Sequence, residues 1–107
     1  MKARTIAAAL CLSTLALACA KATPTEKSDV TIKNFNFGPN AITVAAGATV
    51  TWHNSDGEPH TVVSADGLFR SAALDTGEAF SFKFTKAGTF KYVCTIHPRM
   101  VATVTVK

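Results

Sequence analysis

Four side chains in this sequence are of types that bind soft metal ions, and three of them follow one another closely. Cys94, His97 and Met100 lie at three-residue intervals near the end of the chain, and His60 lies further upstream. Two imidazoles, a thiolate and a weakly bound axial thioether form the ligand set of a blue-copper electron-transfer site. Met100 is the only Met besides the initiator, so its spacing from Cys94 and His97 strengthens its assignment as a ligand. The sequence therefore predicts one copper ion bound by these four residues.

The predicted chemistry is the transfer of single electrons. Copper that carries electrons cycles between Cu(I) and Cu(II), and a site serves best when its geometry is nearly the same in both states. Cu(I) favours soft ligands and Cu(II) favours nitrogen, so a mixed set of imidazoles, thiolate and distant thioether is a compromise. We expect Cys94 to end a strand, which fixes its side chain. The short steps that follow then bring His97 and Met100 round to the same ion.

The first twenty residues have the pattern of a secretory signal peptide. Residues 1–20 consist of a short basic start, a nearly continuous apolar run and the small-residue cleavage site Ala18-Cys19-Ala20. The apolar run is too short to span a membrane and no other stretch is longer, so we expect a periplasmic protein with no transmembrane span. The alternative is a lipoprotein signal that leaves Cys19 as an acylated N-terminus. Ala16 matches that pattern imperfectly, because a branched aliphatic residue is usual there.

Loss of a signal peptide would leave Cys94 as the lone cysteine, because Cys11 and Cys19 precede the cut. No disulfide is then expected within the mature chain. A lone thiol in an oxidising compartment is a liability, and coordination to a metal ion would hold the sulfur as a buried thiolate. The alternative is an inert cysteine in the core, which is common in general. The neighbouring His97 and Met100 favour the metal site.

The charges and the other polar residues favour no further chemistry. The formal net charge is +4 with neutral histidines and about +2 without Lys2 and Arg4, which is too small and too scattered to suggest nucleic-acid binding. His53 alternates with Val50 and Trp52, which we expect to point inward, so His53 is predicted to face solvent. The sequence has no recognisable paired carboxylates or Ser/His/Asp set for hydrolysis.

Short strands are the elements that must position the ligands. The chain beyond residue 28 shows no helical period, and turn residues recur about every 8 to 12 positions, which favours an antiparallel sandwich. We expect one domain, 29–107, after a flexible leader, 21–28, with His60 on the side of the sandwich opposite Cys94. Residues 65–77 are expected to form a loop or one distorted helical turn. The predicted strands are 30–35, 41–44, 49–54, 61–64, 80–84, 89–94 and 101–106.

Aromatic side chains on or beside these strands are expected to form the core or to pack next to it. A domain of this size buries something over about 60% of the surface of its unfolded chain, which is enough for it to fold alone. We assign the phenylalanines among them to packing and not to function. They are Phe35, Trp52, Phe80, Phe82, Phe84, Phe90 and Tyr92.

In these motifs the sequence resembles the cupredoxin family, and within it the small amicyanin- and plastocyanin-like members with a short Cys-x-x-His-x-x-Met loop. The resemblance covers residues 30–106 and rests on segments 46–52, 58–62 and 87–100. It implies a Greek-key β-sandwich of about seven to eight strands, one type 1 copper ion and outer-sphere electron transfer. It also implies a protein that is not an enzyme with a substrate of its own.

Further details follow from the resemblance. It implies that His60 and His97 bind copper through Nδ1 and that the edge of His97 reaches the surface. Many relatives carry Asn after the first His ligand, where its side chain hydrogen-bonds the loop after the Cys. Thr61 stands there in this chain, and its shorter side chain predicts a weaker or absent clamp on Thr95. Arg99 replaces an aromatic residue, which makes the exit face less apolar.

Two functions compete for this copper site. The leading prediction is a monomeric, diffusible shuttle between redox proteins, with a dehydrogenase or a c-type cytochrome as the partner that the resemblance suggests. The alternative is copper trafficking or resistance, in which the ion is handed over or sequestered. Trafficking sites favour exchangeable ligands, often several Met or paired Cys. The predicted mature chain has one Met and one Cys, both assigned to the site, which favours the shuttle.

Overall fold

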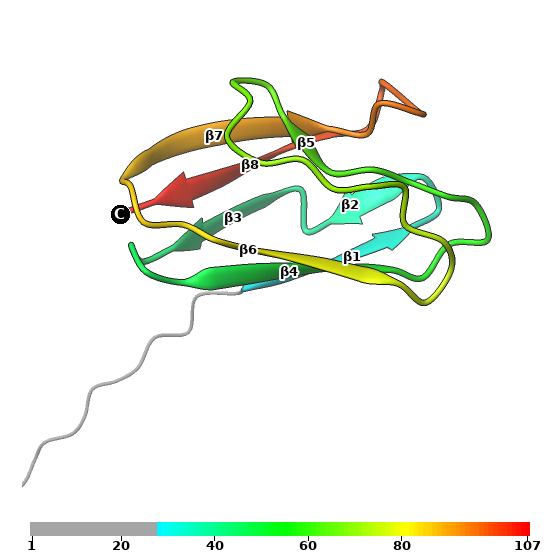
Figure 1. Ribbon diagram of the computed structural model, residues 1–107, viewed down its shortest axis with the longest axis horizontal. Coiled ribbons are helices and arrows are strands. Elements are labelled where there is room, and N and C mark those ends of the chain that lie inside the picture. Colours follow the sequence, from blue (N-terminus) through cyan, green and yellow to red (C-terminus); the bar gives the residue numbers. More distant parts are fainter. Residues whose placement is uncertain (1–27) are drawn as a thin grey trace, which may run out of the picture.

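The computed structural model describes residues 28–107, which form eight strands and no helix (Figure 1). The predicted signal peptide, 1–20, lies outside the described residues, as does the predicted leader except for Ser28. The strands are β1 (Asp29–Lys33), β2 (Asn36–Gly38), β3 (Ala41–Val44), β4 (Thr49–Asn54), β5 (Val63–Ser64), β6 (Ala79–Lys83), β7 (Gly88–Val93) and β8 (Val101–Val106).

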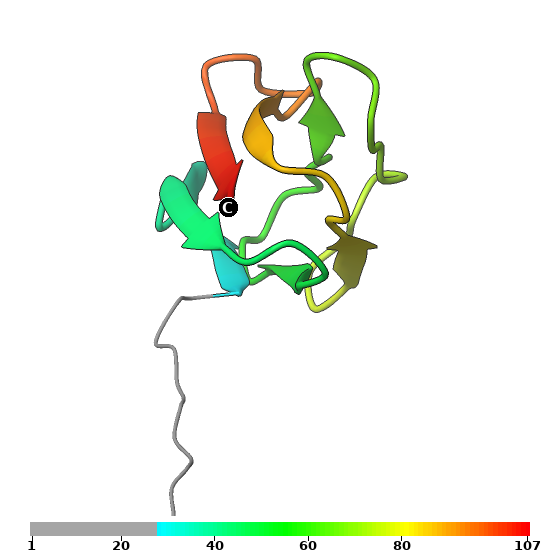
Figure 2. The ribbon, with the colours of Figure 1, turned by 90° about the vertical axis from the view of Figure 1, so that its left-hand side faces the viewer.

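The strands form two sheets of four that pack face to face. One sheet has the order β2-β1-β4-β6 and the other the order β3-β8-β7-β5. Viewed along the sandwich, the sheet that contains β7 and β8 lies above the sheet that contains β4 and β6 (Figure 2). The predicted all-β sandwich is confirmed. The prediction of purely antiparallel pairing is wrong, because β1 pairs with β4 and β3 pairs with β8 in parallel.

The parallel pairs follow from how the chain alternates between the sheets. After β1 and β2 the chain crosses to the second sheet as β3 and then returns to the first sheet as β4. Because β4 re-enters beside β1 and runs in the same direction, it forms a parallel pair. Strand β8 enters beside β3 in the same way. Connections through the opposite sheet leave room for this geometry, which a two-residue hairpin does not.

Most strand boundaries agree with the alternation in the sequence, and one departure concerns the site. The sequence predicts a first strand that extends to Phe35, but β1 ends at Lys33 and a short hairpin leads into β2. Asn34 and Phe35 form the connection, with φ of 53° and 58°. Positive φ in a bulky residue costs on the order of 1–3 kcal/mol and persists only where the surroundings hold it.

Other departures lie in the long connection between β4 and β6. The predicted strand 61–64 is reduced to β5, and residues 65–77 form turns and isolated bridges with no helical turn. One of these bridges pairs His60 with Leu74 through two backbone hydrogen bonds, of 3.1 and 2.7 Å. The loop thus supplies the backbone partners of a segment that is too irregular to be a strand.

The core lies between the two sheets. Trp52, Tyr92 and Phe84 are almost completely buried and Phe90 is 6% exposed, while Phe80 and Phe82 pack against the core as partly buried residues. Burying a large apolar side chain contributes roughly 1.5–3 kcal/mol, so this cluster dominates the stability. The core prediction is wrong for Phe35, which is 48% exposed, because the hairpin turns its side chain out of the sheet pattern.

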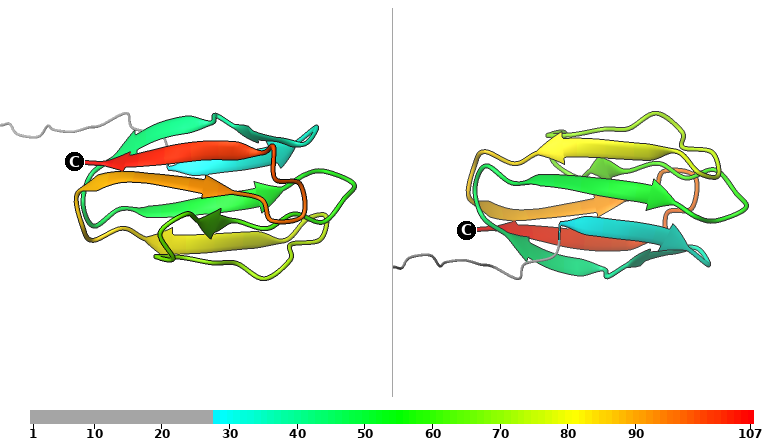
Figure 3. Two further views of the ribbon diagram at one scale, coloured as in Figure 1. Left: turned by 90° about the horizontal axis from the view of Figure 1, so that it is seen from above. Right: turned by 90° about the horizontal axis from the view of Figure 1, so that it is seen from below.

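The two ends of the sandwich differ. The loop between β7 and β8 lies at one end and the C-terminus at the other (Figure 3). Because β1, β4 and β7 all run toward that loop, their following turns gather at the same end. Among residues 28–107, no helix has the length and apolar character needed to cross a membrane.

Candidate metal centre

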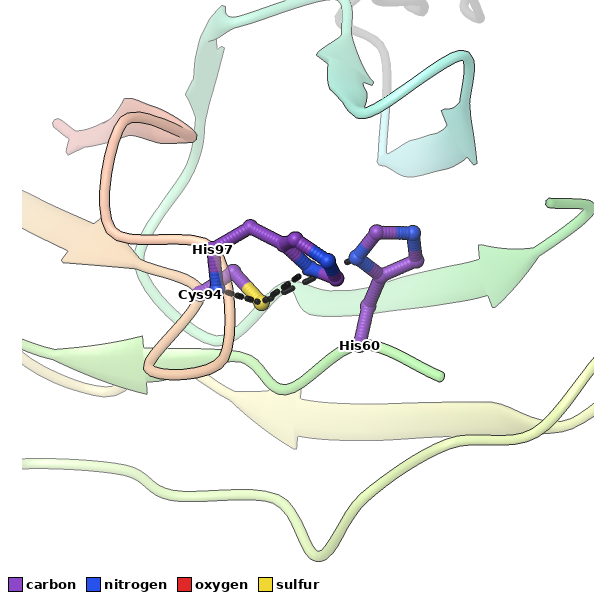
Figure 4. Close-up of side chains that lie close together, drawn as sticks. All are labelled: His60, Cys94 and His97. Carbon is purple, nitrogen blue, oxygen red and sulfur yellow. Dashed lines mark hydrogen bonds between the residues drawn. The ribbon is translucent and has the colours of Figure 1, made fainter. Parts of the chain in front are cut away.

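Three of the four predicted ligands converge at the end of the sandwich beyond β7. One donor atom each of His60, Cys94 and His97 lie within 4.8 Å of one another, a group that is able to hold a metal ion. Cys94 Sγ lies 3.7 Å from His60 Nδ1 and 3.8 Å from His97 Nδ1. Figure 4 shows the two rings directed toward the sulfur from different segments of the chain. Both imidazoles therefore present Nδ1, as the resemblance implies.

Cys94 follows the last residue of β7, and its sulfur is held by backbone donors. The N–H groups of Thr61 and His97 each donate to Sγ at 3.4 Å, and the side chain is fully buried. Burial alone raises the pKa of the thiol. Hydrogen bonds to the sulfur, chiefly from the Thr61 N–H, outweigh burial and lower the pKa of Cys94 to about 6. The site thus favours a thiolate, which is the form that binds metals.

His60 is completely buried in the segment that leads into β5. Strand β5 pairs with β7, so both His60 and Cys94 are carried by the same sheet, and the expectation of opposite sides is wrong. His60 Nε2 lies 2.9 Å from Asp56 Oδ2. Because the carboxylate accepts the hydrogen bond, Nε2 carries the proton and Nδ1 keeps its lone pair toward Cys94, the arrangement usual for metal-binding histidines.

Asp56 connects the imidazole of His60 to the hairpin that follows β1. Its Oδ2 accepts hydrogen bonds from Phe35 N–H and from His60 Nε2, each at 2.9 Å. These two donors, with the Phe35 amide first, lower the pKa of Asp56 below its usual value. The carboxylate is therefore ionised at neutral pH, and it fixes the position of the hairpin relative to His60.

A buried amide shapes the turn that carries Asp56. Asn54 is 1% exposed, and its Nδ2 donates to the carbonyl oxygens of Glu58 and Leu74 at 2.9 and 2.8 Å. Its Oδ1 accepts from the N–H of Asp56 at 2.8 Å. A buried polar group is stable only when it is hydrogen-bonded, and Asn54 meets this condition by ordering the backbone on both sides of the turn before His60.

The loop after β7 carries the other two predicted ligands. Cys94 N–H donates to the carbonyl of Met100 at 3.1 Å, and Met100 N–H donates to the carbonyl of His97 at 2.9 Å. These bonds fold the loop back on itself. Met100 is 5% exposed, whereas His97 is half-buried. The loop and the hairpin residues Phe35 and Asn36 line a surface hollow of about 510 Å³.

Thr61 ties this loop to the segment that carries His60. Its Oγ1 accepts from Thr95 N–H at 2.8 Å and lies 2.8 Å from Thr95 Oγ1. From the sequence we expect the clamp on Thr95 to be weaker or absent. It is present, so the expectation of its absence is wrong. Despite its short side chain, Thr61 contacts both the backbone N–H and the hydroxyl of Thr95 directly.

Sequence reasoning missed two residues that contact the predicted ligands, and it placed His53 correctly. Phe35 packs edge-on against both imidazoles, with ring centroids 5.6 Å from His60 and 5.0 Å from His97. Its place after Asn34, between two alternating runs, was the available sign of a two-residue hairpin. The sequence predicts no role for Asp56, although it lies four residues before His60. His53 is a surface residue as predicted, 3.5 Å from Asp29.

Comparison with known proteins gives the family. The model of the cupredoxin-like domain matches residues 5–106, and the chain belongs to this family. It is 32% identical over 119 residues to amicyanin-alpha of Methylorubrum extorquens, with 100% of both chains covered.

Solved structures agree with this assignment. A purple cupredoxin from Nitrosopumilus maritimus is 33% identical, with a TM-score of 0.71, and the match covers 76% of this chain and 100% of that one. The Cu(I) form of an amicyanin variant is 31% identical, with a TM-score of 0.72, over 79% of this chain and 86% of that one. The fold and the family are thus shared with proteins of which at least one was solved with copper.

Proposed function

We propose that this protein is a type 1 copper electron carrier and not an enzyme, with His60, Cys94, His97 and Met100 as the ligands of one copper ion. The observation that carries the proposal is the convergence of two imidazole Nδ1 atoms on one buried cysteine sulfur, at 3.7 and 3.8 Å. Two nitrogens, a thiolate and a thioether suit copper better than the harder divalent ions. The membership of the cupredoxin family supports the same metal.

Each proposed ligand has its own part in the site. Copper supplies the one-electron couple, and the chain holds its ligands so that they move little between the two states. His60 is fixed by Asp56 and by the bridge to Leu74. Cys94 is kept as a thiolate by two backbone N–H groups. His97 is half-buried at the rim of the surface hollow, and we assign it as the path by which the electron leaves.

The setting in the cell is part of the proposal. We propose that residues 1–20 direct export to the periplasm, with retention of an acylated Cys19 as the alternative. We further propose that the protein is a monomer that exchanges electrons with redox proteins, such as a dehydrogenase or a c-type cytochrome, and not with nucleic acid. Copper trafficking is the rival function. Slow release of copper together with fast electron self-exchange supports the carrier, whereas rapid release supports trafficking.

A visible spectrum of the copper-loaded protein tests the ligand set directly. We expect one copper per chain and an intense thiolate-to-Cu(II) band in the oxidised form, because the Cys94 sulfur donates charge to the metal. Cys94→Ser removes the band. His53→Ala, which alters an exposed imidazole outside the candidate ligand group, leaves it unchanged. A Cys94→Ser protein that keeps the band would disprove the assignment.

A further inference from the structure

The hairpin between β1 and β2 contains a residue that its backbone does not favour. Lys33 pairs with Asn36, so Asn34 and Phe35 form a two-residue connection in which both φ angles are positive. This is the conformation of a type I′ turn, for which Asn-Gly is the preferred sequence. Asn34 fits the first position. Phe35 occupies the position of the glycine, where a large side chain is strained.

The ring of Phe35 does not compensate for this strain by being buried in the core, since it is 48% exposed. It lies instead between the turn and the metal centre, edge-on to His60 at an interplanar angle of 81° and to His97 at 73°. The two imidazoles are themselves 4.8 Å apart. One aromatic ring thus contacts both of them, in the geometry that aromatic pairs prefer.

Asp56 holds the strained turn in this place. The Phe35 N–H and the His60 Nε2 donate to the same carboxylate oxygen, so the backbone of Phe35 and the ring of His60 are fixed relative to each other. Among residues 28–107, the His97 ring has no such contact with a carboxylate. Its ring comes from a loop and is half-buried. From outside the loop it contacts the rings of Phe35 and His60.

We propose that Phe35 is a positioning residue that holds the imidazoles of His60 and His97 in their metal-binding orientation, at the expense of strain in its own turn. The inference rests on the proposed copper site. Its physical consequence is that the His97 ring has less freedom to rotate on its solvent side. Copper is therefore released more slowly than it would be with a small residue in the turn.

Three variants separate this role from an ordinary contribution to folding. Phe35→Gly removes the ring and relieves the backbone strain, whereas Phe35→Ala removes the ring and keeps the strain. Leu68→Ala is the matched control, because Leu68 is a large hydrophobic residue with similar exposure, 40%, in a turn outside the site. The release of copper to a chelator is timed for each protein, and the metal-free proteins are melted.

We expect copper release to be faster in both Phe35 variants, roughly ten-fold, the factor that two edge-to-face ring contacts supply. Release from Leu68→Ala matches the wild type. The metal-free Phe35→Gly protein melts at a higher temperature than Phe35→Ala, since only the glycine accepts the turn without strain. A role confined to folding predicts instead that release rates follow the melting temperatures. Either that result or wild-type release from both Phe35 variants overturns the proposal.

A second measurement does not depend on copper. NMR relaxation of the His97 ring in the metal-free protein reports its mobility, which we expect to increase in Phe35→Gly and to stay unchanged in Leu68→Ala. An equally rigid His97 ring in Phe35→Gly overturns the proposal. A failure of the proposed function itself would give a different result, because the wild-type protein would then bind no copper or show no thiolate band.

Discussion

Two ionisable side chains at the centre illustrate how single residues are prepared for a metal. Burial would keep Cys94 protonated, but the hydrogen-bond donors around its sulfur lower its pKa to about 6. Asp56 is likewise held ionised, chiefly by the Phe35 amide. For each group the strongest of the hydrogen-bond donors is a backbone N–H outside the strands, that of Thr61 for Cys94 and that of Phe35 for Asp56. The chemistry of these residues therefore depends on local backbone geometry as much as on residue type.

Met100 is the proposed ligand whose replacement has the simplest expected effect. In Met100→Gln the amide oxygen is a harder axial donor than the thioether, so it stabilises Cu(II) relative to Cu(I) and lowers the reduction potential. Each tenfold gain in the preference for Cu(II) lowers the potential by about 59 mV. Direct electrochemistry of the copper protein measures this shift.

The control for this prediction is Met100→Leu, which removes the donor and retains a side chain of similar volume at a buried position. The loss of an axial donor disfavours Cu(II), so the potential rises. Potentials that move in the same direction in both variants would show that Met100 is not the axial ligand.

At the scale of elements, strands supply the frame and the turns between them supply the ligands. Cys94 follows β7, His60 precedes β5, and His97 and Met100 lie between β7 and β8. Because β5 pairs with β7, the segments that carry His60 and Cys94 are neighbours before any metal is bound. The Thr61–Thr95 contact joins them beyond the last strand residues.

Breaking this contact is expected to loosen both the fold and the site. Thr61→Val has nearly the same shape but leaves the Thr95 N–H without its acceptor, which costs about 1–3 kcal/mol of unfolding free energy. Copper release becomes faster, because the loop with His97 is no longer tied to the segment with His60. Chemical denaturation of the metal-free protein and chelator competition measure the two effects.

Thr51→Val is the matched control, because Thr51 makes a hydroxyl contact of the same length, 2.8 Å, with Ser81 on the exposed face of the other sheet. We expect it to change the free energy of unfolding by less than about 0.5 kcal/mol and to leave copper release unchanged. Equal effects of the two substitutions would mean that the Thr61 hydroxyl has no special role.

The sequence predicted the strands and the ligands better than the contacts between turns. Alternation with period two located most strand boundaries, since each strand has one buried face. It failed at Phe35, because a hairpin reverses the chain there and the pattern carries no information on φ. It also missed Asp56, whose partner Phe35 lies 21 residues away. Contacts of this kind depend on how the two sheets pack, which no local pattern encodes.

The molecule as a whole is polarised along its length. The candidate centre lies at the end where β7 terminates, and the C-terminus and the turn before β7 lie at the opposite end (Figure 3). Among the described residues, Arg99 is the cation that lines the hollow beside His97. Lys86, in the turn between β6 and β7, is exposed at the far end. Arg99 therefore lies beside His97, the proposed exit path for the electron, and Lys86 lies at the other end of the molecule.

This difference makes a prediction about encounter rates. With a small anionic redox reagent, Arg99→Ala is expected to lower the bimolecular rate about threefold at low salt, because a unit charge about 7 Å away in water contributes about 0.6 kcal/mol. Lys86→Ala removes the same charge from the far end and has little effect. With a cationic reagent, Arg99→Ala raises the rate instead. Salt weakens every one of these changes, since steering is screened. Stopped-flow oxidation and reduction provide the rates, and equal effects of the two substitutions would show that electrons do not leave near Arg99.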